Sequence, residues 1–407
     1  MAQQQFVVLG GGVSGLSLAY FLRRQQPRAR IRVLEGAARA GGWVHTANRG
    51  GFLFEEGPRG FRPSRNGAEM LRLKLPTSVR EALSWPLTAE VVKAGVHELF
   101  TKPTSLADES VYDFAARRFS PVVAERLLDP VASGIFGGDI RYLSVRACFK
   151  LLWDLEHERG SVVRGMLFGG SAPSPTLLDG SAKSAFVRGL ETAPAGSAPG
   201  FTVEVERAAT GEREQLPATR VFSTLPAFRL APVVAAAYPA LARTLAEIKF
   251  VSMGMAHVGF NERVLESDGF GYLVPSIERE KVVGVVFDSN AFPSQNAGPD
   301  AGPQTRLSVM SGGAHFPAIT SLSTDELEQL ARDAVRHHLR IAREPDFVRS
   351  VVLPDCIPQY HVGFHDTLAR LEQQLAPGLH LGGNSFYGVG LADCVTRSKE
   401  LALALAQ

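Results

Sequence analysis

Apolar and polar positions follow two different rhythms along this chain. Short apolar or alternating runs, typical of strands, recur from end to end and are densest in the second half. These runs lie at 6–9, 31–34, 201–205, 220–224, 249–260, 270–274, 282–287, 306–311, 347–353 and 380–383. Helical spacing fills much of the rest, at about 77–170, at 325–339 and from about 389 onward. Strands interspersed with helices predict an α/β protein.

The long helical stretch has recognisable starts and stops. Asp108 or Ser110 can cap a helix whose apolar face runs from Val111 to Phe119. Three glycines predict a turn over 133–138, and the Ser, Ala, Pro and Gly content of 171–200 predicts a loop.

The first forty residues combine a strand, a glycine turn, a helix, a second strand and an acid. The turn is Gly10-Gly11-Gly12-Val13-Ser14-Gly15, in which the first glycine allows the tight bend and the last lets helix and strand pack closely. Glu35 stands 20 residues after Gly15, where a carboxylate accepts both hydroxyl groups of a ribose and repels a 2′-phosphate. This unit predicts binding of a dinucleotide without a 2′-phosphate.

The segments beyond Glu35 favour FAD over NAD. Gly41 and Gly42 permit close approach of the backbone to a second part of a long cofactor. FAD is extended and passes several loops, which NAD need not do. The N-terminus of the last helix can also face the pyrophosphate or the flavin. The further residues expected at FAD are Gly36, Arg39, Gly42, Trp43, Gly57, Pro58, Arg59, Gly60, Asn384, Val389, Gly390 and Leu391.

With these motifs the sequence resembles the flavin amine oxidase superfamily, whose members carry R-x-G-G after the ribose acid, as residues 39–42 do. It resembles the protoporphyrinogen oxidase family more closely, because a series of its motifs occurs in order over nearly the whole chain. They are GGW at 41–43, GPRG at 57–60, RACF at 146–149, GFGYLVPS at 269–276, FDS at 287–289, AFP at 291–293, CIPQY at 356–360 and GNSFYGVG at 383–390.

The resemblance implies a Rossmann-type FAD-binding domain, a mixed-sheet substrate domain and a helical, membrane-associated insertion. The FAD-binding domain would comprise 1–76, 184–235 and 375–407, the insertion 77–170 and the substrate domain 236–374. The implied activity is the oxidation of protoporphyrinogen IX to protoporphyrin IX in haem biosynthesis, with non-covalent FAD as cofactor and O2 as electron acceptor.

The implied substrate pocket is apolar with one or two cations. Its expected residues are Arg59, Phe270, Gly271, Leu273, Val286 and Met310. For Leu273, Val286 and Met310 the alternative is a place in the sheet core, and for Trp43 core packing competes with stacking near the flavin. No catalytic side chain is assigned, because flavin carries the chemistry, and no metal site is expected.

Two segments typical of the family have no clear counterpart. One is the hairpin whose arginine binds a substrate propionate. Arg62, Arg72 and Arg80 are candidates to replace it, and nothing in the sequence favours one of them. The other is the adenine-side strand near 184–200, and its loss would leave backbone groups unpaired at about 1–3 kcal/mol each. We therefore expect a shortened chain with weak FAD retention and weak activity. The alternatives are another oxidase or desaturase of the superfamily and a truncated, non-catalytic isoform that binds FAD or tetrapyrrole weakly.

Composition limits the partners. A net charge of +2 argues against nucleic-acid binding. The three cysteines form no C-x-x-C pair, which indicates free thiols, and Cys394 is expected to be a buried thiol without a covalent flavin. The longest apolar runs are too short to span a membrane, and the early first strand leaves no room for a cleavable leader.

The resemblance implies peripheral contact with the mitochondrial inner membrane or, alternatively, with a bacterial membrane from the cytoplasm. The apolar side chains between 111 and 136 are the candidates for this contact, and a core face is the alternative. The sequence does not decide whether the protein forms a homodimer.

Overall fold

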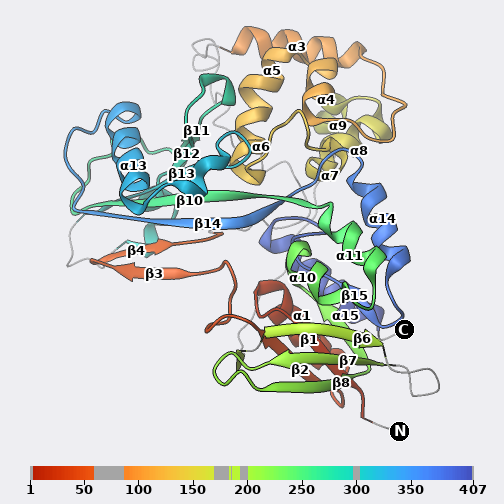
Figure 1. The fold of residues 1–407 in the computed structure, drawn as a ribbon. Coiled ribbons are helices and arrows are strands. Elements are labelled where there is room, and N and C mark those ends of the chain that lie inside the picture. The colour runs from red at the N-terminus through yellow and green to blue at the C-terminus, as the bar shows by residue number, and fades with distance from the viewer. Residues whose placement is uncertain are drawn as a thin grey trace.

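The computed structural model describes residues 3–58, 87–168, 183–184, 186–192, 200–296 and 303–405. Figure 1 shows a parallel sheet with its helices at one end, a long-stranded second sheet in the middle and a cluster of helices at the other end. The chain enters the parallel sheet first, leaves it and returns at 183–184, 220–223 and 379–381, so residues far apart in sequence build one layer.

The parallel sheet has the strand order β15-β9-β1-β2-β5. Helices α1 (Val13–Gln25) and α15 (Leu391–Ala404) pack on one face over Phe6, Val8 and Phe222. These elements confirm the strand, turn, helix and strand expected at the N-terminus. The strands are β1 (Gln5–Leu9), β2 (Arg30–Glu35), β5 (Lys183–Ser184), β9 (Arg220–Ser223) and β15 (Leu379–Leu381).

A three-stranded antiparallel sheet and helices cover the other face of the parallel sheet. The expectation of a loop throughout 171–200 is wrong, because residues 186–192 form a strand that pairs with residues 201–206. The cause lies in the partner: alternate residues of 201–205 are buried, and this strand pairs along both edges. The elements are β6 (Phe186–Thr192), β7 (Phe201–Glu206), β8 (Arg213–Ala218), α10 (Ala227–Val234), α11 (Pro239–Ala246) and α14 (Phe364–Gln374).

The edge strand of the parallel sheet beyond β2 has only two residues. β5 pairs only with Leu34 and Glu35 of β2, so a short strand stands where none was expected. Along Arg30–Val33 no further strand pairs with β2 on this side within the described part of the chain.

The described residues between 87 and 168 form helices joined by loops, with a core of their own. The turn expected at 133–138 is wrong: a helix runs to Phe136 and ends at Gly137, whose φ of +60° is left-handed. Gly134 remains helical because its missing Cβ leaves space for Leu273, which would lie 2.7 Å from such an atom. The elements are α3 (Thr88–Phe100), α4 (Val111–Arg118), α5 (Pro121–Val123), the π-helix η2 (Ala124–Leu128), α6 (Asp129–Phe136), α7 (Val145–Cys148), α8 (Lys150–Arg159) and α9 (Val162–Phe168).

The second sheet has the order β11-β12-β13-β10-β14, and its neighbouring strands are antiparallel. The chain as a whole therefore combines parallel and antiparallel sheets. The strand expected at 347–353 continues to Gln359, because it pairs with β10 over almost its full length. The strands are β10 (Lys249–Phe260), β11 (Gly271–Leu273), β12 (Val282–Val286), β13 (Thr305–Gly312) and β14 (Phe347–Gln359).

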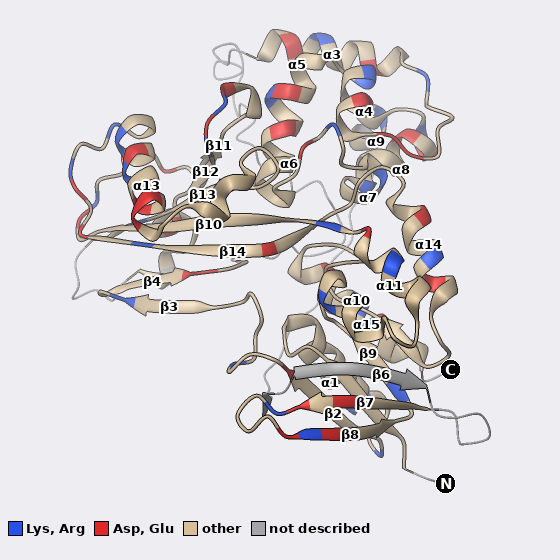
Figure 2. Ribbon diagram, in the orientation of Figure 1, with Lys and Arg blue, Asp and Glu red and all other residues tan. Residues whose placement is uncertain are grey.

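The two faces of this second sheet have different covers. Helix α13 (Thr324–His338) packs on one face over Ala256 and Val258. The hairpin of β3 (Thr46–Arg49) and β4 (Phe52–Glu55) covers one end of the other face, where Phe54 stacks on His257 at 4.7 Å. At its opposite end α6 packs against the same face through Leu273. A strip of the sheet between β4 and α6 is thus framed on two sides, and Figure 2 shows β10 uncharged along most of its length.

Candidate cofactor and substrate site

The glycine turn is closed by contacts that only glycine permits. Gly10 has a φ of +99°, and its N–H donates to the Leu34 carbonyl at 2.8 Å. A Cβ atom on Gly15 would lie 1.9 Å from the Gly10 carbonyl oxygen. The turn therefore lies tightly against α1 and leaves the N-terminus of that helix facing outward.

Glu35 lies at the end of β2, directly beside the turn. One carboxylate oxygen accepts the Gly11 N–H at 2.7 Å, and the other accepts the Ala37 N–H at 2.8 Å across Gly36. These two bonds fix the carboxylate at the mouth of the turn, where the sequence places the ribose acid.

The R-x-G-G segment docks on the glycine turn. The Gly41 N–H donates to the Gly11 carbonyl at 2.9 Å, and Gly42 lies against Gly12. Arg39 donates to the carbonyls of Ala40, Gly42 and Val44, so this arginine fixes the shape of its own loop.

Trp43 is 37% exposed, so core packing of this side chain is excluded. Its backbone carbonyl lies 1.7 Å from where a Cβ atom of Gly57 would be. The GPRG segment thus meets the backbone directly after the R-x-G-G loop through Gly57, while Pro58 is exposed. Arg59 and Gly60 lie outside the described residues, as do Arg62, Arg72 and Arg80.

Two parallel helix N-termini lie near the turn. The Ser398 hydroxyl donates to the Ser14 carbonyl at 2.9 Å, and Gln26 donates to the Leu405 carbonyl at 3.3 Å. Because α15 starts at Leu391, seven residues before Ser398, its N-terminus extends about 10 Å beyond that of α1. Two positive helix ends at this offset suit a ligand with two separated polar parts.

Tyr360 fixes the loop that leads into α15. Its hydroxyl donates to the Asn384 carbonyl and accepts the Gly388 N–H at 3.0 Å, while its ring stacks on Phe364 at 4.2 Å. Burial raises the pKa of Tyr360 well above its usual range, so the phenol stays neutral. The sequence marked CIPQY only as a family motif and assigned Tyr360 no role.

The Cys394 thiol is buried, as expected, and donates to the Gly388 carbonyl at 3.9 Å. Burial raises its pKa, which disfavours the reactive thiolate.

The three apolar residues expected in the substrate pocket lie on one face of the second sheet. Leu273 pairs with Gly284, which pairs with Met310 on its other side. Val286 lies on β12 two residues after Gly284, and therefore on the same face. Leu273 is 37% exposed and the other two are partly exposed, so none is a closed core residue. Gly271 lies opposite Val286, and Phe270 is largely exposed beside it.

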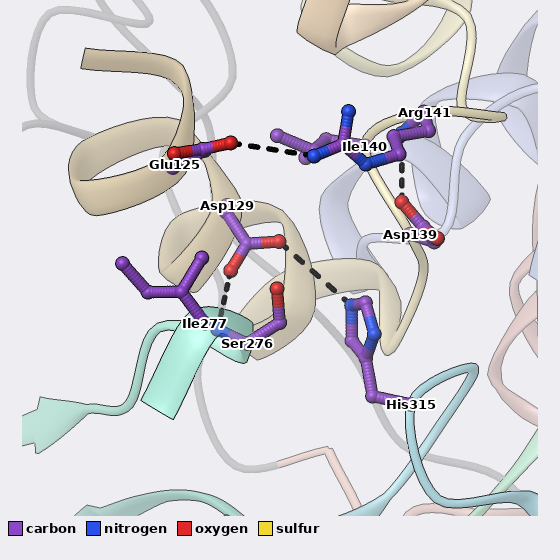
Figure 3. Close-up of a pocket in the computed structure, with 8 residues that line it drawn as sticks. All are labelled: Glu125, Asp129, Asp139, Ile140, Arg141, Ser276, Ile277 and His315. Atoms are coloured by element: carbon purple, nitrogen blue, oxygen red, sulfur yellow. Dashed lines mark hydrogen bonds and ion pairs between the residues drawn. The ribbon is translucent and has the colours of Figure 1, made fainter. Parts of the chain in front are cut away.

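A polar cavity of about 240 Å³ lies beside α6 (Figure 3). The Asp129 carboxylate accepts the Ser276 N–H at 2.6 Å and lies 3.8 Å from the His315 ring. The cavity joins the helices to the second sheet and lacks the apolar lining that a tetrapyrrole requires. Its lining residues are Glu125, Asp129, Asp139, Ile140, Arg141, Ser276, Ile277 and His315.

Comparison with known proteins matches both parts of the chain. Residues 8–73 match the model of an NAD(P)-binding Rossmann-like domain, and residues 73–404 match that of the flavin containing amine oxidoreductases. Protoporphyrinogen oxidase of Macaca fascicularis is 32% identical over 98% of both chains, and that of Homo sapiens is 31% identical over 98% of both. The crystal structure of a provisionally named protoporphyrinogen oxidase from Exiguobacterium superposes with a TM-score of 0.78 at 21% identity, covering 100% of this chain and 99% of that one.

The alignment with the macaque protein occupies 470 positions, more than the 407 residues of this chain. The relative therefore carries segments without a counterpart here.

The described residues fit FAD. The turn admits no side chain at Gly15, Glu35 lies at the end of β2, and the N-termini of two parallel helices lie near the turn. The chain is an FAD-dependent oxidoreductase with a Rossmann-type cofactor unit. It belongs to the flavin-containing amine oxidoreductases and, within them, to the protoporphyrinogen oxidase family.

Proposed function

We infer that the chain oxidises protoporphyrinogen IX to protoporphyrin IX, an FAD-dependent step of haem biosynthesis. One observation carries this inference: the identity of 31–32% to two protoporphyrinogen oxidases extends over 98% of both chains. FAD, when bound, supplies the acceptor for successive two-electron oxidations, and we propose O2 as the final electron acceptor.

We propose that the cofactor lies along the two helix N-termini. The α1 end and the turn at 10–15 would hold the pyrophosphate, Glu35 the ribose hydroxyls, and the α15 end from Val389 to Leu391 the flavin side. Trp43 and Gly57 would flank the flavin, since both belong to loops that meet beside the turn. No covalent bond is proposed, because the Cys394 thiol is buried.

The substrate would lie on the strip of the second sheet between β4 and α6. Leu273, Val286 and Met310 offer apolar side chains on one face there. A broad aliphatic surface of this kind suits the face of a tetrapyrrole better than a small amine, which requires an aromatic cage. On this basis we propose the expected division into a cofactor domain, a substrate domain at 236–374 and a helical insertion at 77–170.

The helical insertion is also our proposed membrane contact, through α3 and not through residues 111–136. The expected side chains, such as Phe114 and Phe136, belong to the buried core of the insertion, because its helices pack against one another. In α3, by contrast, Val92, Val96 and Phe100 form a stripe four residues apart, and they are 61%, 54% and 82% exposed.

No helix among the described residues is both long and apolar enough to cross a bilayer. An exposed stripe on a short helix is suited to lie in the membrane interface. We propose the mitochondrial inner membrane, or a bacterial membrane reached from the cytoplasm, as the surface that it contacts.

The experiment is an absorbance spectrum of the purified protein followed by turnover. We expect a flavin spectrum, complete release of FAD on denaturation, and porphyrin fluorescence that rises with O2 consumption. Anaerobic protein serves as the control. Flavin without porphyrin formation would favour the non-catalytic alternative, and oxidation of an amine or polyene in its place would favour another oxidase of the superfamily. Sedimentation on the same sample tests whether the protein is a dimer.

A further inference from the structure

Arg349 lies on the same face of the second sheet as the apolar side chains proposed to contact the substrate. Met310 pairs with Met255, which pairs with Val351, and Arg349 lies two residues from Val351 on β14. Residues two apart on a strand share one face, so the arginine lies diagonally beyond the apolar row. Two strand spacings and two residues place the Arg349 Cα roughly 12 Å from that of Met310.

The guanidinium is held by one edge only. Its Nε lies 3.3 Å from a carboxylate oxygen of Glu56, and the other oxygen of Glu56 lies 2.7 Å from the His45 ring. Glu56 is 11% exposed and follows β4 directly, whereas the Arg349 side chain is 46% exposed. Among the described residues Glu56 is the polar side chain that binds this guanidinium, so both Nη groups are available to a ligand.

Another arginine of the same face has a different setting. Arg306 is fully buried, and its guanidinium donates to the carbonyls of Leu53 and Phe292 and to Asn296. Its hydrogen bonds are made within the fold, so it is a structural arginine. Arg349 is the one of the two that presents its charge outward.

We propose that Arg349 is a carboxylate-binding residue of the substrate site and receives a propionate group of the tetrapyrrole. This inference rests on the proposed function and deepens it. Glu56 fixes the Nε edge, so the Nη edge is oriented before the ligand arrives, and an arginine fork binds a carboxylate in two-point fashion. The tetrapyrrole ring would lie on the apolar row, and its carboxylate would reach past Val351. Arg349 would thereby replace the arginine of the hairpin that the sequence lacks.

The test compares two substrates that differ only in charge: protoporphyrinogen IX and its dimethyl ester. In Arg349→Met we expect kcat/KM for the acid to fall about ten- to a hundredfold, the loss of a charge-assisted pair, and that for the ester to change less than about twofold. Arg349→Lys should fall between, because it keeps the charge and loses the fork. Fluorescence quenching with protoporphyrin IX and its dimethyl ester gives the same comparison without turnover.

Arg343→Met is the matched control, because Arg343 is 44% exposed and ion-paired with Glu262 and Asp346 away from this strip. This variant should leave kcat/KM unchanged for both substrates. A wild-type protein that oxidises neither substrate refutes the proposed function. An active wild type in which Arg349→Met affects acid and ester alike, or affects neither, refutes only the inference. Flavin content and spectrum of each variant show whether a loss arises at the cofactor, which would also contradict it.

Discussion

The hydroxyl group of Tyr360 donates a hydrogen bond to the backbone carbonyl of Asn384. Since Tyr360 directly follows the long strand β14 and Asn384 lies in the loop before α15, this bond joins the second sheet to that loop. A second bond, from the Gly388 N–H, makes the same hydroxyl an acceptor.

Tyr360→Phe should weaken FAD binding while leaving the fold intact. The variant removes a buried donor and acceptor, leaving the Asn384 carbonyl and the Gly388 N–H unpaired at about 1–3 kcal/mol each. Part of that cost falls on the cofactor-bound state, so we expect the FAD dissociation constant to rise about tenfold. Flavin titration measures it, with Tyr142→Phe, at an exposed tyrosine, as control. An unchanged dissociation constant would show that the loop holds its shape without this bond.

Glu35→Gln should weaken FAD binding by about 1–3 kcal/mol, because the ribose loses a charged acceptor. The amide also turns an NH2 group toward the N–H of Gly11 or Ala37. Thermal melting of the apoprotein separates this local effect from the loss of the ribose contact. If the variant binds FAD as tightly as the wild type, Glu35 is not a cofactor-binding residue.

Met310→Ala should raise the KM for protoporphyrinogen about five- to thirtyfold, the value of an apolar side chain buried against the ring. FAD content should stay near that of the wild type. Met166→Ala changes an exposed methionine of α9 and should leave both the KM and the FAD content unchanged. A loss of flavin that matches the loss of activity would argue against a place in the substrate pocket.

His380 should make the protein less stable in acid. Burial, with the nearby Arg220 and Arg397, lowers the pKa of His380 from 6.5 to about 4. The unfolded chain therefore binds a proton that the folded protein excludes between these values. The stabilisation is complete above pH 6.5 and is lost as the pH falls toward 4, by at most about 3 kcal/mol, less because solvent screens a partly exposed ring. In His380→Leu, urea unfolding should depend less on pH over this range than in the wild type. His337→Leu, at an exposed position, should not differ from the wild type.

Phe100→Asp should reduce binding to anionic lipid vesicles about ten- to a hundredfold, because one exposed aromatic side chain no longer enters the interface. Val362→Asp changes an exposed apolar residue far from α3 in sequence and serves as control. Equal cosedimentation of the two variants would exclude the α3 stripe.

The sequence predicted elements whose pattern is local. The strands at 249–260, 282–287 and 306–311 were placed almost to the residue, because one or both faces of each are buried and the apolar pattern records this. The glycine turn was equally clear, since a strand, a helix, a second strand and an acid stand at the expected offsets around it. The helix through Gly134 was missed, because its glycine reflects contact with Leu273, more than a hundred residues away.

The same reason explains which residues the sequence did not single out. Leu273, Val286 and Met310 were predicted to line the pocket because they match the family's positions and each stands on a recognisable strand, and the structure places them on one face. Tyr360 and Arg349 were not singled out, because their roles depend on contacts between segments far apart in sequence. Tyr360 meets Asn384, and Arg349 meets Glu56, only in the folded chain.

The parallel helices α1 and α15 have a consequence for biosynthesis. We proposed that their N-termini flank one ligand, although Val13 and Leu391 are far apart in sequence. Because α1 and α15 are far apart in sequence, the glycine turn is translated long before its partner helix. A nascent chain therefore lacks the proposed flavin end of its cofactor site until α15 has been made. FAD should accordingly be acquired only after α15 has been translated, and a chain arrested before residue 391 should stay colourless.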